Sequence, residues 1–254
     1  MGVSIIDKTS VFDMKNSLGK LVPVMSGLTA LHFDGITSGL NQCLNGSAFT
    51  VVGSPVNEGD YITSYNKSAF VKTQSPCTSE GTFITVVRLF LNKQGYNNTV
   101  LGWYPLYRGV SLILNESEGL QINCNVKSAD GGDRSFSSAI SVSTFTSETS
   151  PYTGRWAAVM ARWGKNSDGI FSMELKNITS GQRGINKAED GDELVTEVGG
   201  YPFVIGSGIY GSSISGDEKS LAATALYNRA LSDLDVQSMY VYLKGYFSRR
   251  GISI

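Results

Sequence analysis

The stretch LAATALYNRALSDLDVQSMYVYL, residues 221–243, joins the pattern of a strand to that of a helix without a linker. Over residues 221–227, small or apolar side chains alternate onto both faces, which indicates a strand in the interior of a sheet. Ser232 then stands where a helix N-cap is expected, and Asp235 follows three residues later, as in a capping box. Apolar side chains recur at helical spacing after this cap: Val236, Met239, Tyr240, Leu243 and Phe247. The pattern predicts a helix over 232–248 that docks on the β structure and plugs an open end of it.

The start of this helix is also marked by charge. Asp233 and Asp235 lie in its first turn, where the helix dipole favours negative charge. Arg229 precedes them in the turn that follows the strand, and we expect it to pair with one of the two carboxylates. Local signals thus predict where the strand ends and the helix begins.

The remaining chain has the composition and spacing of an all-β protein. Among 254 residues, glycine is frequent (29) and charged residues are sparse (17 %), which suits short strands and tight turns. The run GTFITVVRLFL, residues 81–91, is apolar on both faces and predicts a central strand covered on both sides. Residues 109–126 and 154–181 each consist of two alternating runs around a turn, which predicts two hairpins. We therefore predict one all-β sandwich of antiparallel strands over residues 26–254, preceded by an arm or first strand pair over 1–25.

Charge and cysteine usage exclude several classes of protein. The net charge is −1, with acids and bases mixed along the chain, so the sequence shows no electrostatic footprint for nucleic acid. No apolar run approaches the length of a membrane span, and no membrane insertion is expected. No secretory signal is visible at the first residues. Cys43, Cys77 and Cys124 are isolated, which predicts buried free thiols rather than disulfides or a zinc site.

The segment ALYNRALSDLDVQSMY, residues 225–240, closely resembles the terminal signature of the laminin-G-like branch of the concanavalin A-like lectin/glucanase superfamily. Further landmarks similar to those of the family occur in the family's order: ALHFDG (30–35), GTFITVVRLF (81–90), GRWAAVMARW (154–163) and FVIGSG (203–208). The resemblance covers residues 28–243. The family's usual Gly-x-Ile-Asp approach to the last strand is GDEKSLAAT (216–224) here, so an acidic role at that place is not carried over.

The resemblance implies a jelly roll of two antiparallel sheets, and the relatives mostly bind glycans or proteins, with some glycosidases among them. Many relatives are accessory modules or phage tail and fibre adhesins. We therefore expect a non-catalytic carbohydrate-binding or host-adhesion module of phage or prophage origin. Its partner would be a glycan or host cell-surface polysaccharide, with a homo-oligomer as one assembly state, in the virion or the cytoplasm of the producing cell. Two alternatives stay open: a structural or protein-interaction module of a virion or larger assembly, and a glycosidase.

The segment GWYPLYRG, residues 102–109, carries the side chains best suited to a sugar. Trp103, Tyr104 and Tyr107 can stack on the apolar faces of sugar rings, and Arg108 offers forked donors to hydroxyls or carboxylates. Trp163 is a further ligand-binding candidate, because it stands at the end of a predicted strand where its ring would be open to solvent. The alternative is an ordinary loop whose aromatic residues fill an edge of the sandwich.

Other aromatic and imidazole side chains favour packing. Trp156 is similar to the core tryptophan of the family's Gly-x-Trp strand. Tyr201 and Tyr210 flank the glycine-rich loop IGSGIYGSS and are weaker binding candidates. His32 is the sole histidine and lies in an alternating run, so we expect a half-buried packing residue rather than a catalytic base.

Two acidic segments could hold calcium. SADGGD, residues 128–133, could donate Asp130 and Asp133, although a glycine-rich turn explains the segment equally well. EDGDE, residues 189–193, is the densest acid cluster, but its central Asp-Gly favours a solvated hairpin tip over calcium or a pair of glycosidase carboxylates. Calcium is the one cofactor considered, and no catalytic residue is predicted.

Overall fold

A computed structural model of the chain describes residues 22–33, 41–43, 46–66, 68–89, 98–102, 109–115, 119–140, 154–196, 202–207 and 219–254. In this part of the chain, two antiparallel sheets of eight strands each are followed by one helix. Sheet A contains β1 (Leu28–Phe33), β3 (Val56–Asn57), β4 (Ile62–Tyr65), β6 (Gly81–Leu89), β11 (Arg155–Lys165), β12 (Phe171–Asn177), β13 (Arg183–Lys187) and β16 (Lys219–Tyr227). Sheet B contains β2 (Thr50–Val52), β5 (Phe70–Pro76), β7 (Asn98–Gly102), β8 (Ser111–Asn115), β9 (Gly119–Lys127), β10 (Asp133–Ile140), β14 (Glu193–Leu194) and β15 (Pro202–Ile205).

The strand order confirms the prediction of an all-β sandwich. Sheet A runs β13-β12-β11-β6-β16-β4-β3, with β1 also paired to β16. Sheet B runs β10-β9-β8-β7-β15-β5-β2, with β14 also paired to β9. The strand expected at 81–91 is β6, which is central between β11 and β16, and the two expected hairpins are β8–β9 and β11–β12.

The main core lies between the sheets and follows from the two-residue period of the strands. In β9, the inward side chains are Leu120, Ile122, Cys124 and Val126, and the residues between them face outward. In β6 and β16 nearly every residue is buried, so both faces of these two strands are covered. Sheet B covers one face, and a second layer covers the other.

The second layer is α1 (Asp233–Ser248), which begins as the sequence predicts. Ser232 is the N-cap: its Oγ accepts from the Asp235 amide at 3.1 Å, while the Asp235 carboxylate accepts from the Ser232 amide at 3.4 Å. Arg229 pairs with Asp235, Nη2 to Oδ2 at 3.1 Å, which confirms the expected tie between turn and helix. Asp233 pairs instead with Arg162 of β11, at 2.7 Å.

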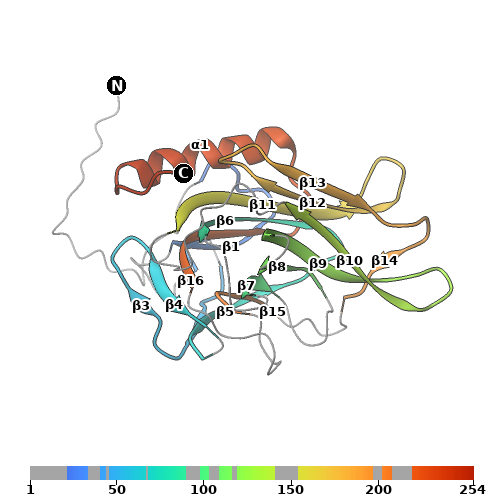
Figure 1. Ribbon diagram of the computed structural model, residues 1–254, viewed down its shortest axis with the longest axis horizontal. Coiled ribbons are helices and arrows are strands. Elements are labelled where there is room, and N and C mark those ends of the chain that lie inside the picture. Colours follow the sequence, from blue (N-terminus) through green and yellow to red (C-terminus); the bar gives the residue numbers. More distant parts are fainter. Residues whose placement is uncertain are drawn as a thin grey trace.

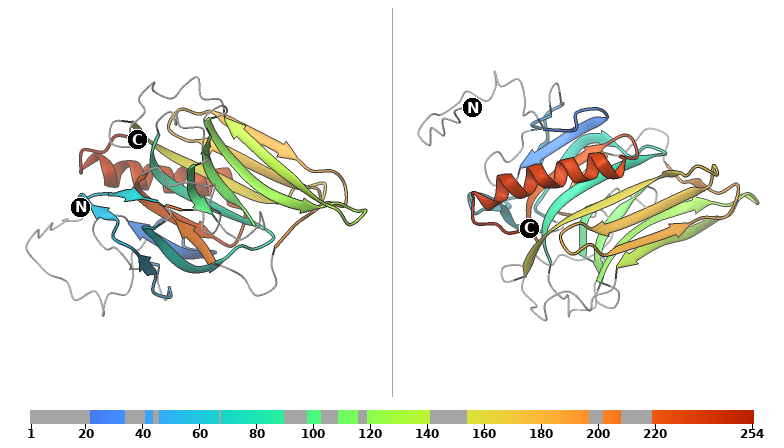
Figure 2. Two further views of the ribbon diagram at one scale, coloured as in Figure 1. Left: turned by 60° about the horizontal axis from the view of Figure 1, so that its bottom comes forward. Right: turned by 90° about the horizontal axis from the view of Figure 1, so that it is seen from above.

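The predicted position of this helix is wrong. Instead of plugging an open end of the sandwich, α1 lies across the outer face of sheet A (Figures 1 and 2). The helix buries Val236, Met239, Leu243, Tyr246 and Phe247, in one cluster with the sheet residues Ile84, Val86, Ala158, Met160, Ala223 and Ala225. The physical reason is that β6, β11 and β16 carry apolar side chains on their outer face too, and this face must be removed from water.

The segment that precedes β1 belongs to the same outer cluster. Val22 and Val24 are buried in it, and the Tyr227 hydroxyl donates to the Val24 carbonyl oxygen at 3.2 Å. Of the arm predicted over residues 1–25, only residues 22–25 are described, and residues 1–21 lie outside the described part of the chain.

Two expectations about the chain as a whole can be compared with the structure. Cys43, Cys77 and Cys124 are free, as predicted, and Cys43 and Cys124 are buried. No helix in the described ranges is long and apolar enough to span a membrane.

Candidate functional site

The outer face of sheet B carries a row of neutral polar side chains on β9. Gln121, Asn123 and Asn125 alternate with core residues and are partly exposed. In contrast to the outer face of sheet A, no described helix lies on this face. The amide side chains on the outer face of β9 can therefore offer hydrogen-bond donors and acceptors to a ligand without displacing a described helix.

The strand register extends this row across three strands. Asn123 lies directly opposite Ser111 of β8 on one side and Ser137 of β10 on the other. Asn125 lies opposite Ser135 of β10. Side chains of directly opposite residues share one face of a sheet at about 4.5–5.5 Å. We call this surface the amide row, and it consists of Gln121, Asn123, Asn125, Ser111, Ser135 and Ser137.

The centre of the amide row contains an unsatisfied polar atom. Among the described residues, Oδ1 of Asn123 is shielded from solvent and accepts no hydrogen bond. Leaving a buried acceptor without a donor costs about 1–3 kcal/mol, so native structures rarely keep one without a reason. A ligand hydroxyl that donates to this oxygen, after the Asn123 side chain turns toward solvent, would recover that free energy.

The aromatic segment singled out in the sequence stands between β7 and β8 along the chain. Trp103, Tyr104, Tyr107 and Arg108 themselves lie outside the described residues, but the flanking glycines are described. Gly102 ends β7, and the Gly109 amide donates to the Val195 carbonyl oxygen at 2.9 Å. Val195 in turn donates its amide to the carbonyl oxygen of Asn125 at 2.9 Å. Both ends of the segment are thus anchored at the end of sheet B where Asn123 and Asn125 lie.

Trp163 does not lie where the sequence suggested. Its side chain is in the core between the sheets, with the residue 2 % exposed, so the expectation of an open ring is wrong. The indole packs against Phe83 and Phe203, with ring centroids 5.9 and 6.0 Å away, and Nε1 donates to the Thr78 carbonyl oxygen at 2.9 Å. Position 163 is an inward one in β11, and the strand does not end until Lys165.

Asp130 and Asp133 lie at the turn between β9 and β10, and both are exposed. The Asp130 carboxylate accepts from the Ser128 hydroxyl and from the Gly132 amide, and these hydrogen bonds lower the pKa of Asp130. No three His, Cys, Asp or Glu side chains in the described ranges are grouped as a metal site. Calcium binding by this turn stays a prediction.

The acid cluster at 189–193 is less solvated than expected. Asp192 is buried, and its carboxylate pairs with Arg134 of β10, which also reaches Glu189 at 2.8 Å. Glu193 pairs instead with Lys165 at 3.3 Å. The segment contains the expected Asp-Gly turn, with Gly191 at φ +84°. Glu189 and Asp192 share Arg134, and Glu193 pairs with Lys165, so these ion pairs fasten the turn to β10 and β11.

The remaining ring residues are packing residues of two kinds. His32 is fully buried rather than half-buried, with its ring edge-on to Phe49 at 5.4 Å. Trp156 packs as expected, but on the outer cluster of sheet A and partly exposed, where the Arg88 guanidinium lies 4.6 Å from its ring centre and 4.9 Å from that of Tyr61. Tyr201 and Tyr210 lie outside the described residues.

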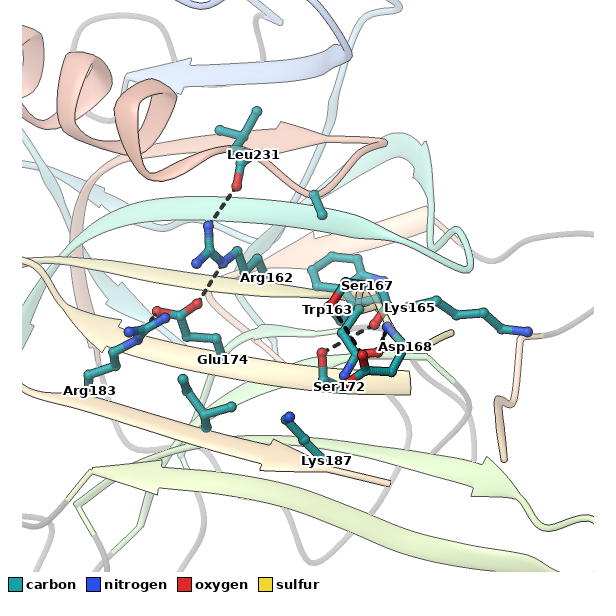
Figure 3. A pocket seen from close by; sticks show the side chains of 14 residues that line it. Arg162, Trp163, Lys165, Ser167, Asp168, Ser172, Glu174, Arg183, Lys187 and Leu231 are labelled. Carbon is teal, nitrogen blue, oxygen red and sulfur yellow. Dashed lines mark hydrogen bonds and ion pairs between the residues drawn. The ribbon is translucent and has the colours of Figure 1, made fainter. Parts of the chain in front are cut away.

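A second polar surface lies on sheet A and was not predicted. It is a groove of about 350 Å³ beside the start of α1, and Figure 3 shows its lining. Glu174 of β12 is nearly buried at its floor, between Arg162 Nε at 2.6 Å and Arg183 Nε at 2.5 Å. We call this surface the charged groove, and its polar lining includes Arg162, Lys165, Asp168, Ser172, Glu174, Arg183 and Lys187.

Neither surface was singled out from the sequence. The amides at 121, 123 and 125 alternate visibly in the sequence, so their shared face could have been noticed. The groove residues come mainly from three consecutive strands, β11, β12 and β13, and the register of their pairing brings them onto one face.

Comparison with known proteins identifies the fold but no family. No protein-family model matches the chain, and no curated protein does. Among solved structures, the chain is similar to the receptor-binding domain of the botulinum neurotoxin C/D mosaic serotype, with 12 % identity, a TM-score of 0.58 and 86 % of this chain covered. The receptor-binding domain of botulinum neurotoxin D gives 14 % identity and a TM-score of 0.56, also over 86 % of this chain.

A third similar structure is the ligand-binding domain of botulinum neurotoxin serotype D in complex with N-acetylneuraminic acid, with 12 % identity and a TM-score of 0.55 over 86 % of this chain. The chain spans about half the length of these structures, 51 to 52 %. At such low identity the likeness shows a shared fold, and a ligand of the whole neighbour is not thereby assigned to the matched half.

Proposed function

We propose that this chain is a non-catalytic carbohydrate-binding module whose ligand lies along the amide row of sheet B. The observation that carries the proposal is the unsatisfied Oδ1 of Asn123, at the centre of a polar sheet face. Sugar hydroxyls both donate and accept hydrogen bonds, as do the amides and hydroxyls of the row. Because the row contains no charged side chain, a neutral glycan is the chemistry that it fits.

Two further observations support this function. The described residues that flank the aromatic segment 103–108 lie at the same end of sheet B, and aromatic rings of this kind stack on the apolar faces of sugars. The fold is also similar to that of the neurotoxin D ligand-binding domain solved with N-acetylneuraminic acid. A further similar structure concerns botulinum neurotoxin type C, whose cell entry is described as dependent on interaction with two ganglioside molecules. A phage or host-adhesion setting, a homo-oligomer and calcium binding remain predictions beside this proposal.

A glycan array followed by calorimetry on the best ligand tests the proposal, with and without calcium. Each neutral hydrogen bond contributes about 0.5–1.5 kcal/mol, so the double variant N123A/N125A should weaken binding about tenfold. Trp103→Ala should weaken it as well if the aromatic segment stacks on the sugar.

The matched control is Gln74→Ala, which removes an exposed amide from β5 at the other side of sheet B and should leave affinity unchanged. An array that is blank in both conditions would contradict the proposal. So would equal losses in the control and the double variant, because the ligand would then not depend on the amide row. Release of reducing sugar would show that the chain is a glycosidase instead.

A further inference from the structure

The charged groove lies where α1 stops covering sheet A. The outward residues of β6, β16 and much of β11 are apolar and are covered by the helix. Further toward the edge, the outward positions of β12 and β13 are Ser172, Glu174, Lys176, Arg183, Ile185 and Lys187. Apart from the buried Glu174, these side chains are partly or fully exposed.

A buried carboxylate at the floor of the groove holds two arginines in place. The Glu174 side chain is only 7 % exposed, and its two oxygens accept from Arg162 and Arg183. Burying such a group is expensive, and well-packed apolar residues often stabilise a protein as well or better. The Glu174 carboxylate fixes the direction of an arginine side chain, which an apolar residue at this position could not do.

The two arginines differ in what they have left to offer. All three nitrogens of Arg162 have partners, because Nε donates to Glu174, Nη1 to the Leu231 carbonyl oxygen at 2.7 Å and Nη2 to Asp233 at 2.7 Å. Arg183 donates its Nε to Glu174 and is 46 % exposed, and no described residue accepts from its two Nη groups. Its guanidinium is thus oriented from behind and presents a free fork, the geometry that pairs best with a carboxylate, sulfate or phosphate.

Further cations surround this fork with little to neutralise them. Lys176 lies directly opposite Arg183 across β12 and β13, an arrangement of like charges that destabilises a sheet. Lys187 lies on the same face of β13, about 13 Å from Arg183 along the strand, with exposed Ile185 between them. Of the lining carboxylates, only Asp168 at the β11–β12 turn has no cation paired to it in the described residues.

We propose that the charged groove is an oxyanion-binding site, in which the fork of Arg183 takes a carboxylate, sulfate or phosphate group. Lys187 supplies a second positive charge for the same ligand, and Ile185 an apolar contact between the two. The volume of about 350 Å³ suits a small polar ligand, since ligand pockets begin at about 300 Å³. The site lies on the opposite sheet from the amide row and does not rest on the proposed function.

Isothermal titration calorimetry at low ionic strength tests this proposal with four probes. Sodium sulfate, sodium phosphate and glucuronate carry the oxyanion either free or on a sugar, and glucose lacks it. We expect saturable one-site binding of at least one of the three anions, and no binding of glucose once the amide row is removed by N123A/N125A. Arg183→Gln should weaken the affinity for the anion at least tenfold. Arg183→Lys should weaken it nearly as much, because lysine keeps the charge but lacks the forked pair of N–H donors.

Glu174 keeps its contact with Arg162 in both variants, so the fold should persist, which a thermal melt checks. Lys187→Gln removes an exposed cation that has no ion pair in the described residues. This change should weaken the affinity for the anion about threefold to tenfold. It keeps the proposal testable if Arg183 variants fail to fold. The matched control is Arg155→Gln, an exposed arginine at the other end of β11.

The proposal is overturned if none of the three anions binds saturably, if glucose binds to N123A/N125A as well as glucuronate does, or if Arg155→Gln weakens anion binding as much as Arg183→Gln. Loss of affinity in Arg183→Gln with an unaffected Arg155→Gln supports it. The N123A/N125A variant should bind the anion normally, so the fate of the carbohydrate proposal can be read separately.

Discussion

Replacing Phe247 by alanine tests whether α1 is a packed layer of the fold. Phe247 is fully buried, and its ring lies 6.1 Å from that of Phe33 in β1 and 5.0 Å from that of Tyr246. Truncating a buried phenylalanine removes its transfer free energy and leaves a cavity, which together cost about 3–5 kcal/mol. For a chain of this size, each kcal/mol lowers Tm by about 2–4 °C, so we expect a fall of roughly 6–20 °C.

Urea and thermal unfolding followed by circular dichroism measure this loss. Val241→Ala is the control, because Val241 lies on the same helix and is 60 % exposed, and its change should stay within about 0.5 kcal/mol. If Phe247→Ala is too unstable to purify, Phe247→Leu should show a smaller loss of the same sign. A cost below about 1 kcal/mol for Phe247→Ala, or a cost equal to that of the control, would refute the description of α1 as a layer that covers sheet A.

Further predictions concern buried polar groups and the helix cap. The Thr85 hydroxyl donates to a backbone carbonyl at 3.0 Å and lies 3.1 Å from the Thr224 hydroxyl, so Thr85→Val should cost about 1–3 kcal/mol in urea unfolding, and adding Thr224→Val should recover part of this. Ser232→Ala removes the N-cap oxygen of α1 and should cost about 1 kcal/mol by the same measurement. Burial raises the pKa of the Tyr227 hydroxyl, so the folded state keeps the hydroxyl proton at a pH where the unfolded chain loses it. The resulting stabilisation is complete below about pH 10 and is lost as the pH rises further. Tyr227→Phe should therefore reduce the fall of the urea midpoint at alkaline pH. Burial also raises the pKa of the Cys124 thiol, so a thiol reagent at pH 8 should label it only after unfolding.

Each of these has an outcome that would contradict it. The threonine pair is uncoupled if the two single variants add up to the double variant, and the cap is unimportant if Ser232→Ala is neutral. An alkaline slope unchanged by Tyr227→Phe would place the titrating group elsewhere. Rapid labelling of native protein at Cys124 would show that this part of the core opens readily.

Much of the fold was predictable because its signals are local. Apolar residues on both faces predicted the central strand over 81–91, and Ser232 and Asp235 marked the start of the helix within four residues. Hairpins were predictable for the same reason, since turn residues and alternation lie close together along the chain. At the β11–β12 turn, Asn166 Oδ1 accepts from the Asp168 and Ile170 amides, and Gly169 takes φ +79°.

The candidate sites were predictable to a smaller extent. Trp163 looked like a strand-end residue, but its exposure depended on where β11 ends and on which way position 163 faces. Asp192 looked like part of a solvated tip until Arg134, 58 residues earlier, proved to be its partner. In both cases a contact between distant segments decided the environment of the side chain.

The sequence by itself determined the strands, the turns and the capped helix, because backbone preferences and the alternation of apolar side chains act within a few residues. Only the tertiary structure decided that α1 covers sheet A, that the amide row of sheet B is left without such a cover, and that Glu174 holds Arg183 from behind. The cover of sheet A depends on strands far apart in sequence, because β6 pairs with β11 and β16. The amide row and the Glu174–Arg183 pair depend instead on the register of neighbouring hairpin strands. Which face is buried, and which charged groups meet, is fixed only when those strands have paired.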